Sequence, residues 1–222
     1  MSKGADPETR QGRVRKQWGT WHGGRHRLLV NPWIAKAVIL AANLVMIAIR
    51  APHGQRSRGV RIVKDRKGGL EVGLLILAML GFVLPLIWLV SPVFAFAEYP
   101  LRIGPLIAGI ACFAVSLWLF YRSHADLGTN WSVTLQIRDQ HRLVTQGVYR
   151  RIRHPMYSAL FLYSVGQLFV LPNWVAGPSY LVAFGSLFAL RVRAEERMML
   201  EEFGAQYSSY MARTKRLVPG LW

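Results

Sequence analysis

Side chains that could bind a charged ligand gather in two polar segments, residues 122–157 and 191–219, which flank a long apolar stretch. The first segment contains the sequence Arg153-His154-Pro155. Proline is favoured at the first position of a helix, where its missing N–H costs nothing, so Pro155 predicts a helix start beside Arg153. Arginine side chains and the positive end of a helix dipole attract anions. The first segment therefore predicts a site for an anionic group such as a ligand carboxylate.

The second segment carries two adjacent carboxylates, Glu195 and Glu196, on a helical pattern. Glu196 begins a series with spacings of four, three, four and three residues that continues with Leu200, Phe203, Tyr207 and Tyr210. These residues share one helix face, and a carboxylate on that otherwise apolar face needs a partner because burying a lone charge is costly. Neighbouring residues diverge by about 100° around a helix, so adjacency alone does not let Glu195 and Glu196 share a proton.

Arg213 is a further candidate for chemistry, but it lies far from Glu196 along the chain. The 17 positions between them span roughly 25 Å of straight helix. The two residues therefore meet only if Gly204 breaks the helix, or else they serve different ends of a ligand. Two simpler interpretations stay open: the basic residues before Pro155 anchor lipid headgroups, and the glutamates begin a solvated interfacial helix.

Long apolar stretches position these segments. Three stretches contain no Asp, Glu, Lys or Arg: Val72–Ala97, Ile103–Tyr121 and Pro155–Leu190. A membrane-spanning helix needs about 20 mostly apolar residues, so the 36-residue third stretch is too long for one span. Turn residues at 171–174 divide it into a predicted helical hairpin of residues 155–171 and 174–190. A weaker segment, Trp33–Ile49, contains Lys36 and either spans the membrane or lies flat on its surface.

The charge distribution predicts an orientation. The chain has a net charge of +17 and is 52% hydrophobic, and its basic residues concentrate in residues 50–69 (+6), 122–154 (+4) and 191–222 (+2). Basic loops stay in the cytoplasm, so both polar segments are predicted to face the cytoplasm. The first 30 residues carry +5 and break this rule if Trp33–Ile49 spans. Attraction to anionic headgroups accounts for the basic charge, so no nucleic-acid partner is expected.

These observations predict an all-α integral membrane helical bundle with four transmembrane helices and a C-terminal cytoplasmic helix, and the family resemblance described below favours Trp33–Ile49 as the first of five transmembrane helices. The expected organisation is a basic arm over residues 1–32 and a membrane domain over residues 33–222, with a ligand site built from 122–157 and 191–219. The six histidines have no paired helical spacing and the chain has one cysteine, so no metal site is expected. We expect an integral membrane protein, located in the inner membrane if the cell is bacterial.

Two sequence blocks resemble a known family. Residues 141–157, HRLVTQGVYRRIRHPMY, are similar to the H-x-L-V-T-x-G-x-Y-x-x-x-R-H-P-x-Y segment of the isoprenylcysteine carboxyl methyltransferases. Residues 195–219 resemble the family's second block, a Glu-Glu pair followed by F-G-x-x-Y-x-x-Y-x-x-R and a final proline. The resemblance covers roughly residues 130–219. It implies a membrane-embedded enzyme that uses S-adenosyl-L-methionine at a cytoplasmic site and methylates a lipophilic or membrane-associated acceptor, with O-methylation favoured.

The resemblance also assigns roles by position. It implies a cofactor pocket that contains His141, Leu143, Val144, Gly147, Tyr149, Arg153, His154, Pro155, Tyr157, Glu195 and Glu196. It further implies catalytic roles for Glu196 and for Arg213, which would lie near the reacting acceptor. The carboxylate of the cofactor suits the anion site at Arg153, and its cationic amino and sulfonium groups suit a nearby glutamate.

Other functions remain open at this point. Similar blocks occur in enzymes that methylate phospholipid amines or small thiols, and membrane sterol reductases that use NADPH carry a similar C-terminal half. A non-enzymatic membrane interaction protein is the third alternative. Against a transport role, the four strong apolar segments contain no ionisable side chains other than Cys112 and tyrosines.

Overall fold

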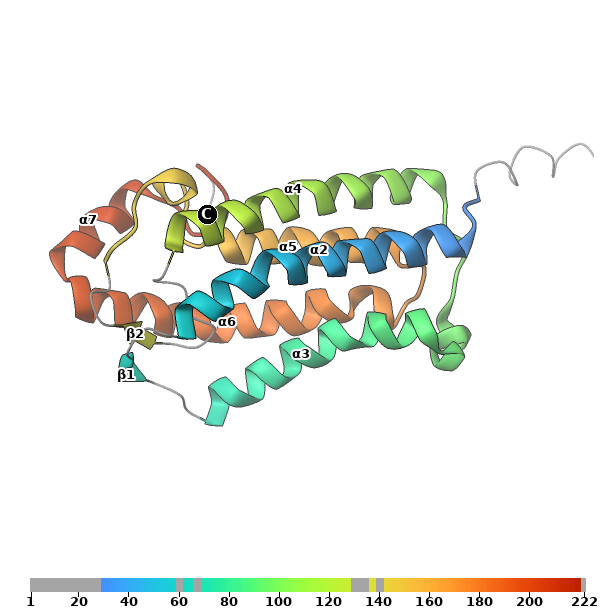
Figure 1. Ribbon diagram of the computed structural model, residues 1–222, viewed down its shortest axis with the longest axis horizontal. Helices are drawn as coiled ribbons and strands as arrows, with labels where there is room; N and C mark the ends of the chain where they lie inside the picture. Colours follow the sequence, from blue (N-terminus) through green and yellow to red (C-terminus); the bar gives the residue numbers. More distant parts are fainter. Residues whose placement is uncertain (1–28, 59–61, 66–68, 129–135, 139–141, 221–222) are drawn as a thin grey trace, which may run out of the picture.

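The computed structural model describes residues 29–58, 62–65, 69–128, 136–138 and 142–220. Its long helices run alongside one another and are α2 (Pro32–Arg58), α3 (Gly69–Val90), α4 (Ile103–Leu127), α5 (Pro155–Val170) and α6 (Ala176–Phe203) (Figure 1). The shorter elements are the 3-10 helices η2 (Pro92–Ala97) and η4 (Gly147–Arg150), helix α7 (Ala205–Arg213), and strands β1 (Ile62–Asp65) and β2 (Gln136–Arg138). The predicted class, a helical membrane bundle, is confirmed, with one small antiparallel sheet added to it.

Three of the helices are long and apolar enough to cross a membrane: Pro32–His53 with 22 residues, Val72–Val90 with 19 and Ile103–Leu127 with 25. Helix α5 is apolar but has 16 residues, and α6 is apolar only up to Leu190. The segment Trp33–Ile49, for which the sequence left two interpretations open, is thus part of a helix long enough to span the membrane. Its buried residues Ala35, Ile39, Ala42 and Met46 follow a helical spacing and join the core, which places α2 in the bundle.

Lys36 lies at one end of this bundle, where a long side chain reaches a polar partner. Its Nζ donates to the Leu89 carbonyl at 3.1 Å and lies 5.2 Å from the Trp33 ring and 5.3 Å from the Trp88 ring. Cation–π contacts and a backbone acceptor together satisfy a charge near the membrane. This contact explains how α2 accommodates a lysine within its apolar stretch.

Small residues allow the helices to approach closely. A Cβ built on Gly109 of α4 would overlap Val170 of α5 and approach the Gly166 carbonyl, and Ser116 Oγ donates to the Ala159 carbonyl at 2.7 Å. Interfaces between membrane helices are enriched in small residues because such residues let the backbones pack. Helices α4 and α5 therefore pack closely against each other.

The hairpin between α5 and α6 is confirmed, and buried Asn173 organises its turn. Asn173 Nδ2 donates to the Phe94 carbonyl at 2.7 Å, and its Oδ1 accepts from the N–H groups of Val175 and Ala176 at 3.0 and 2.9 Å. A backbone bridge between Glu98 and Asn173 lies at the same end. We call this end of the bundle the turn end.

The three basic segments meet at the opposite end, as the charge pattern predicts (Figure 1). Strand β1 pairs with β2, and residue 152 forms a bridge with residue 215, which joins all three segments. Helix α2 begins at the turn end, where Val30 N donates to the Leu101 carbonyl at 2.9 Å. Apart from its last four residues, the predicted arm 1–32 lies outside the described residues, and the conflict between its charge and the orientation rule remains.

Candidate functional site

The polar end is organised around Glu196, whose side chain is 5% exposed. Arg153 Nε donates to Glu196 Oε1 at 3.1 Å, and Arg216 Nη2 donates to Oε2 at 2.6 Å. His154 Nε2 lies 3.3 Å from Glu196 Oε1. The predicted need of this carboxylate for a partner is confirmed, and so is the expectation that the two polar segments meet. We call these four side chains the Glu196 cluster.

Two opposing effects act on the carboxyl group of Glu196. Burial alone would raise its pKa, because a low dielectric disfavours the charged form. Hydrogen bonds to His154 and Arg216, together with the positive charges of His154 and Arg153, outweigh burial and hold the pKa of Glu196 far below its ordinary value. The same pairing raises the pKa of Arg216. Glu196 is therefore charged at neutral pH and pairs with the cations around it.

The C-terminal tail brings Arg216 to this cluster. A break at Gly204, which has φ +49°, ends α6 and lets α7 turn back, as the sequence allowed. Backbone N–H groups of Arg153 and His154 then donate to the carbonyls of Lys215 and Arg216 at 2.7 and 3.0 Å. Arg153 Nη1 also donates to the carbonyl of Thr214. The tail thus lies against the start of α5, which begins at Pro155 as predicted.

A second set of contacts fixes the loop before α5. Gly147 has φ +60°, and a Cβ at this position would overlap the Asp126 carboxylate, whose Oδ2 accepts from Val148 N at 2.9 Å. Tyr210 OH donates to the Tyr149 carbonyl at 2.6 Å and so ties α7 to this loop. Only glycine combines this backbone conformation with the close approach of a carboxylate.

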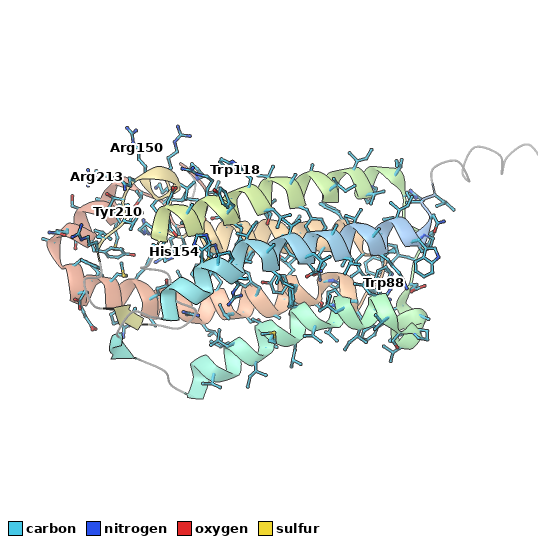
Figure 2. All side chains as sticks on the ribbon, in the orientation of Figure 1. Trp88, Trp118, Arg150, His154, Tyr210 and Arg213 are labelled. Atoms are coloured by element: carbon cyan, nitrogen blue, oxygen red, sulfur yellow. The ribbon has the colours of Figure 1, made fainter. Side chains whose placement is uncertain are left out.

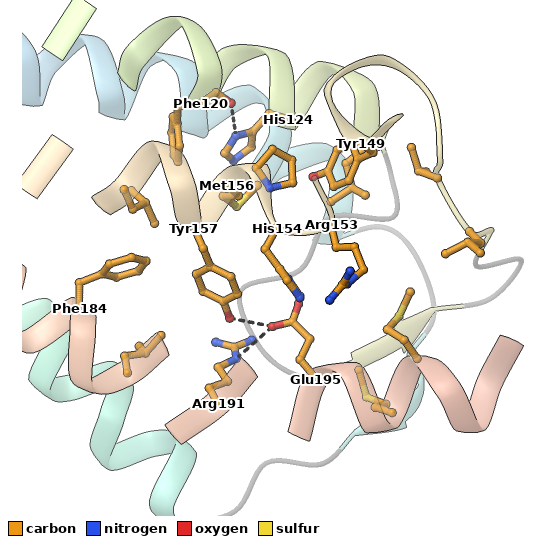
Figure 3. A pocket seen from close by; sticks show the side chains of 18 of the residues that line it. Phe120, His124, Tyr149, Arg153, His154, Met156, Tyr157, Phe184, Arg191 and Glu195 are labelled. Carbon is orange, nitrogen blue, oxygen red and sulfur yellow. Dashed lines mark hydrogen bonds and ion pairs between the residues drawn. The ribbon is translucent and has the colours of Figure 1, made fainter. Parts of the chain in front are cut away.

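A cavity of about 260 Å³ adjoins the Glu196 cluster (Figure 3). Its polar wall includes Arg142, Tyr149, Arg153, His154, Tyr157, Arg191, Glu195, Tyr207 and Tyr210. Its apolar wall extends into the bundle along Leu75, Ala78, Phe120, Leu160, Phe184 and Leu187. One cavity thus joins a charged end to the apolar interior, an arrangement typical of sites for amphiphilic ligands.

Glu195 faces this cavity while its neighbour Glu196 stands behind it. Tyr157 OH donates to Glu195 Oε2 at 2.7 Å, and Arg191 Nε lies 4.0 Å from the same oxygen (Figure 3). The Glu195 side chain is 28% exposed. The two adjacent carboxylates therefore diverge as expected: Glu196 pairs with protein cations, whereas Glu195 faces the cavity.

The structure brings most of the predicted cofactor residues to the cavity. Those that line it are Leu143, Val144, Tyr149, Arg153, His154, Pro155, Tyr157 and Glu195. Gly147 and Glu196 stand behind the wall in supporting contacts, and His141 lies outside the described residues. The ligand roles of these residues remain predictions.

Arg213 lies on the exposed outer side of α7, with Nε donating to the Ser209 carbonyl at 3.3 Å (Figure 2). It is not among the residues that line the cavity, and its catalytic role remains a prediction. Arg216, which the sequence did not single out, is the arginine of the tail that binds Glu196. The signal for it was present in the charge that Glu196 required, but the sequence does not say which of the nearby cations supplies it.

This fold and site define an integral membrane protein with a cavity at the polar end of a helical bundle. Residues 107–201 match the model of the isoprenylcysteine carboxyl methyltransferase (ICMT) family. The protein-S-isoprenylcysteine O-methyltransferase B of Arabidopsis thaliana is 36% identical over 94 residues, which cover 41% of this chain and 48% of the relative. The human protein-S-isoprenylcysteine O-methyltransferase is 35% identical over 94 residues, which cover 41% of this chain and 33% of the relative.

A solved structure of the eukaryotic intramembrane Ras methyltransferase ICMT is also similar, at 25% identity and a TM-score of 0.49, covering 68% of this chain and 50% of the other. The chain spans less than half the length of the curated relatives named above. The family resemblance is confirmed for residues 107–201, which contain the first block and only the start of the second, and the relatives are named O-methyltransferases. The reductase and non-enzymatic alternatives are therefore not favoured.

Proposed function

We propose that this chain is an integral membrane methyltransferase that uses S-adenosyl-L-methionine to methylate a carboxylate on a lipophilic or prenylated acceptor. The observation that carries the proposal is the cavity, which joins charged residues around Glu195 and Arg153 to an apolar wall inside the bundle. The family match of residues 107–201 supports the reaction type. The basic charge of the polar end supports a cytoplasmic orientation, in the inner membrane if the cell is bacterial.

The residues present fit the proposed cofactor. Glu195 would attract its cationic amino and sulfonium groups, and Arg153 and His154 would face its carboxylate. Aromatic and thioether side chains, Tyr149 and Met198 among them, offer surfaces for a flat base. When bound, this cofactor supplies a methyl group on a sulfonium, ready for displacement.

The protein's part in such a transfer is to position and to shield. A carboxylate acceptor is already a nucleophile at neutral pH, so no side chain has to remove a proton. Holding the reacting atoms about 3 to 3.5 Å apart in a site without bulk water supplies the rate gain. Glu196 would act indirectly, because its charge fixes Arg153 and His154 at the cavity wall.

The test uses the purified full chain in lipid nanodiscs. We expect calorimetric binding of S-adenosylhomocysteine and transfer of a labelled methyl group from S-adenosyl-L-methionine to N-acetyl-S-farnesylcysteine. The matched control acceptor is the corresponding carboxamide, which should take up no label. Label in the amine of a phospholipid, or binding of NADPH in place of the methyl donor, would contradict the proposal.

A further inference from the structure

The apolar part of the cavity follows one face of α6. The residues Tyr180, Phe184, Leu187 and Arg191 line the cavity at spacings of four, three and four, which places them on the same helix face. Helix α6 begins at the turn end and runs to the polar end (Figure 1). Tyr180 is therefore the lining residue of α6 that lies deepest in the bundle, eleven residues or about 16 Å along the helix from Arg191.

Three aromatic rings hold the Tyr180 ring in place. Its centroid lies 5.7 Å from that of Phe184, 6.0 Å from that of Tyr163 and 6.0 Å from that of Phe82. These separations are typical of favourable aromatic pairs. Phe82 comes from α3 and Tyr163 from α5, and neither is among the described residues that line the cavity. The ring of Tyr180 thus lies between the cavity and the packed rings beyond it.

Helices α3 and α6 also approach each other closely beside Tyr180. A Cβ built on Gly81 of α3 would overlap the Cβ of Ala183, and Ser179 Oγ donates to the Gly81 carbonyl at 3.1 Å. Small residues at such a contact let two membrane helices pack backbone against backbone. This contact closes the space between α3 and α6 at the level of Tyr180, so the cavity has a floor there.

We infer that Tyr180 is a specificity-determining residue that limits the length of the apolar chain of the acceptor. This inference rests on the proposed function: an acceptor carboxylate that reacts near Glu195 sends its apolar chain into the bundle along α6. A chain that is too long meets the Tyr180 ring, and closely packed side chains yield little room for extra volume. A shorter chain ends before the ring and is accepted.

The test measures the binding of two acids by calorimetry in nanodiscs: N-acetyl-S-farnesylcysteine, and N-acetyl-S-geranylgeranylcysteine, whose chain is one isoprene unit longer. Both acids dissolve in the lipid of the nanodisc, and this partitioning is the same for every variant, so the ratio of the two affinities is compared between variants. We expect Tyr180→Ala to shift this ratio at least about 10-fold towards the longer chain. Tyr180→Leu disturbs the packing less and should shift the ratio in the same direction.

Two control variants show whether the size of the ring is responsible. Tyr180→Phe keeps the ring and removes only the hydroxyl group, so it should keep the ratio of the wild type. Tyr121→Ala removes an exposed tyrosine of α4 that does not line the cavity and should also keep that ratio. An unchanged ratio in Tyr180→Ala and Tyr180→Leu, or a shifted ratio in Tyr180→Phe, would overturn the inference.

Donor binding and methyl transfer separate this inference from the proposed function. Each variant should bind S-adenosylhomocysteine within about twofold of the wild type, because Tyr180 lies far from Glu195 along α6. If the wild type transfers the methyl group but the ratio is the same in every variant, the chain of the acceptor leaves the cavity for the bilayer and the role of Tyr180 is overturned. If the ratio shifts as expected but the wild type transfers no methyl group, the proposed function is overturned and the floor of the cavity still limits chain length.

Discussion

The two ends of the bundle both bury polar side chains, but these side chains have different partners. At the turn end, Asn173 and Gln167 bind backbone groups of the hairpin turn. At the site end, the Glu196 cluster pairs side chains with side chains, and Glu195 stands beside it facing a cavity. Backbone partners fix one conformation of the chain, whereas side-chain cations around a cavity prepare a charged surface. Asn173 and Gln167 thus differ from the Glu196 cluster in having backbone rather than charged side-chain partners, and it is the end with the charged cluster that we propose binds a ligand.

Removing the carboxylate of Glu196 should have the largest effect. Glu196→Ala leaves Arg153 and His154 buried without their counter-ion, so we expect a loss of about 3–5 kcal/mol in unfolding free energy and loss of donor binding. Denaturation followed by tryptophan fluorescence in detergent measures the first effect, and calorimetry with S-adenosylhomocysteine measures the second. Glu196→Gln keeps an acceptor oxygen and should lose less unfolding free energy and less donor affinity than Glu196→Ala. A stable Glu196→Ala protein that binds the donor normally would show that the two ends do not differ as described.

Asn173→Ala is the corresponding change at the turn end. It leaves the Phe94 carbonyl and the N–H groups of Val175 and Ala176 without their side-chain partner, so we expect a loss of about 1–3 kcal/mol in stability. Donor affinity of the folded protein should stay the same. Asn173→Asp keeps the acceptor oxygen, so its unfolding free energy should lie between those of the wild type and Asn173→Ala. A large change in donor affinity would mean that the turn end contributes to the site.

The sequence predicted the local features of both ends because they depend on neighbouring residues. The helix start at Pro155 follows from backbone chemistry, and the need of Glu196 for a partner follows from its apolar helix face, whereas the break at Gly204 was one of two alternatives that the sequence left open. The choice of Arg216 as that partner, and the presence of Leu75 and Ala78 of α3 in the cavity wall, depend on how distant segments fold together. A long-range contact of this kind leaves no spacing signal in a single chain.

Glu195→Gln should separate binding from stability. This change removes the charge that faces the cavity but keeps an acceptor for Tyr157 OH, and Arg191 Nε lies 4.0 Å from the carboxylate, so the loss of unfolding free energy should be smaller than in Glu196→Ala. Donor affinity should fall about tenfold, because a charged hydrogen bond to the cationic groups of the donor becomes a neutral one. Glu202→Gln, at an exposed position on the same helix, is the control and should have no effect. Unchanged donor affinity in Glu195→Gln would assign the cationic groups of the donor to another part of the cavity.

Acid titration should give the smallest effect. It tests whether the folded protein holds Glu196 in its charged form. The pKa of Glu196 is lowered in the folded protein, so the stability it contributes is present above its ordinary value of 4.5 and is lost as pH falls. Between about pH 4.5 and about pH 3.5 the wild type should lose about 1 kcal/mol more than Glu196→Gln, which has no carboxyl group to protonate. Subtracting the two titrations removes the contribution of the other acids, including Glu195. If the unfolding free energies of the wild type and Glu196→Gln fall in parallel with pH, Glu196 is not held as an anion. Hydrogen bonds alone would then stabilise the site end, as they do the turn end.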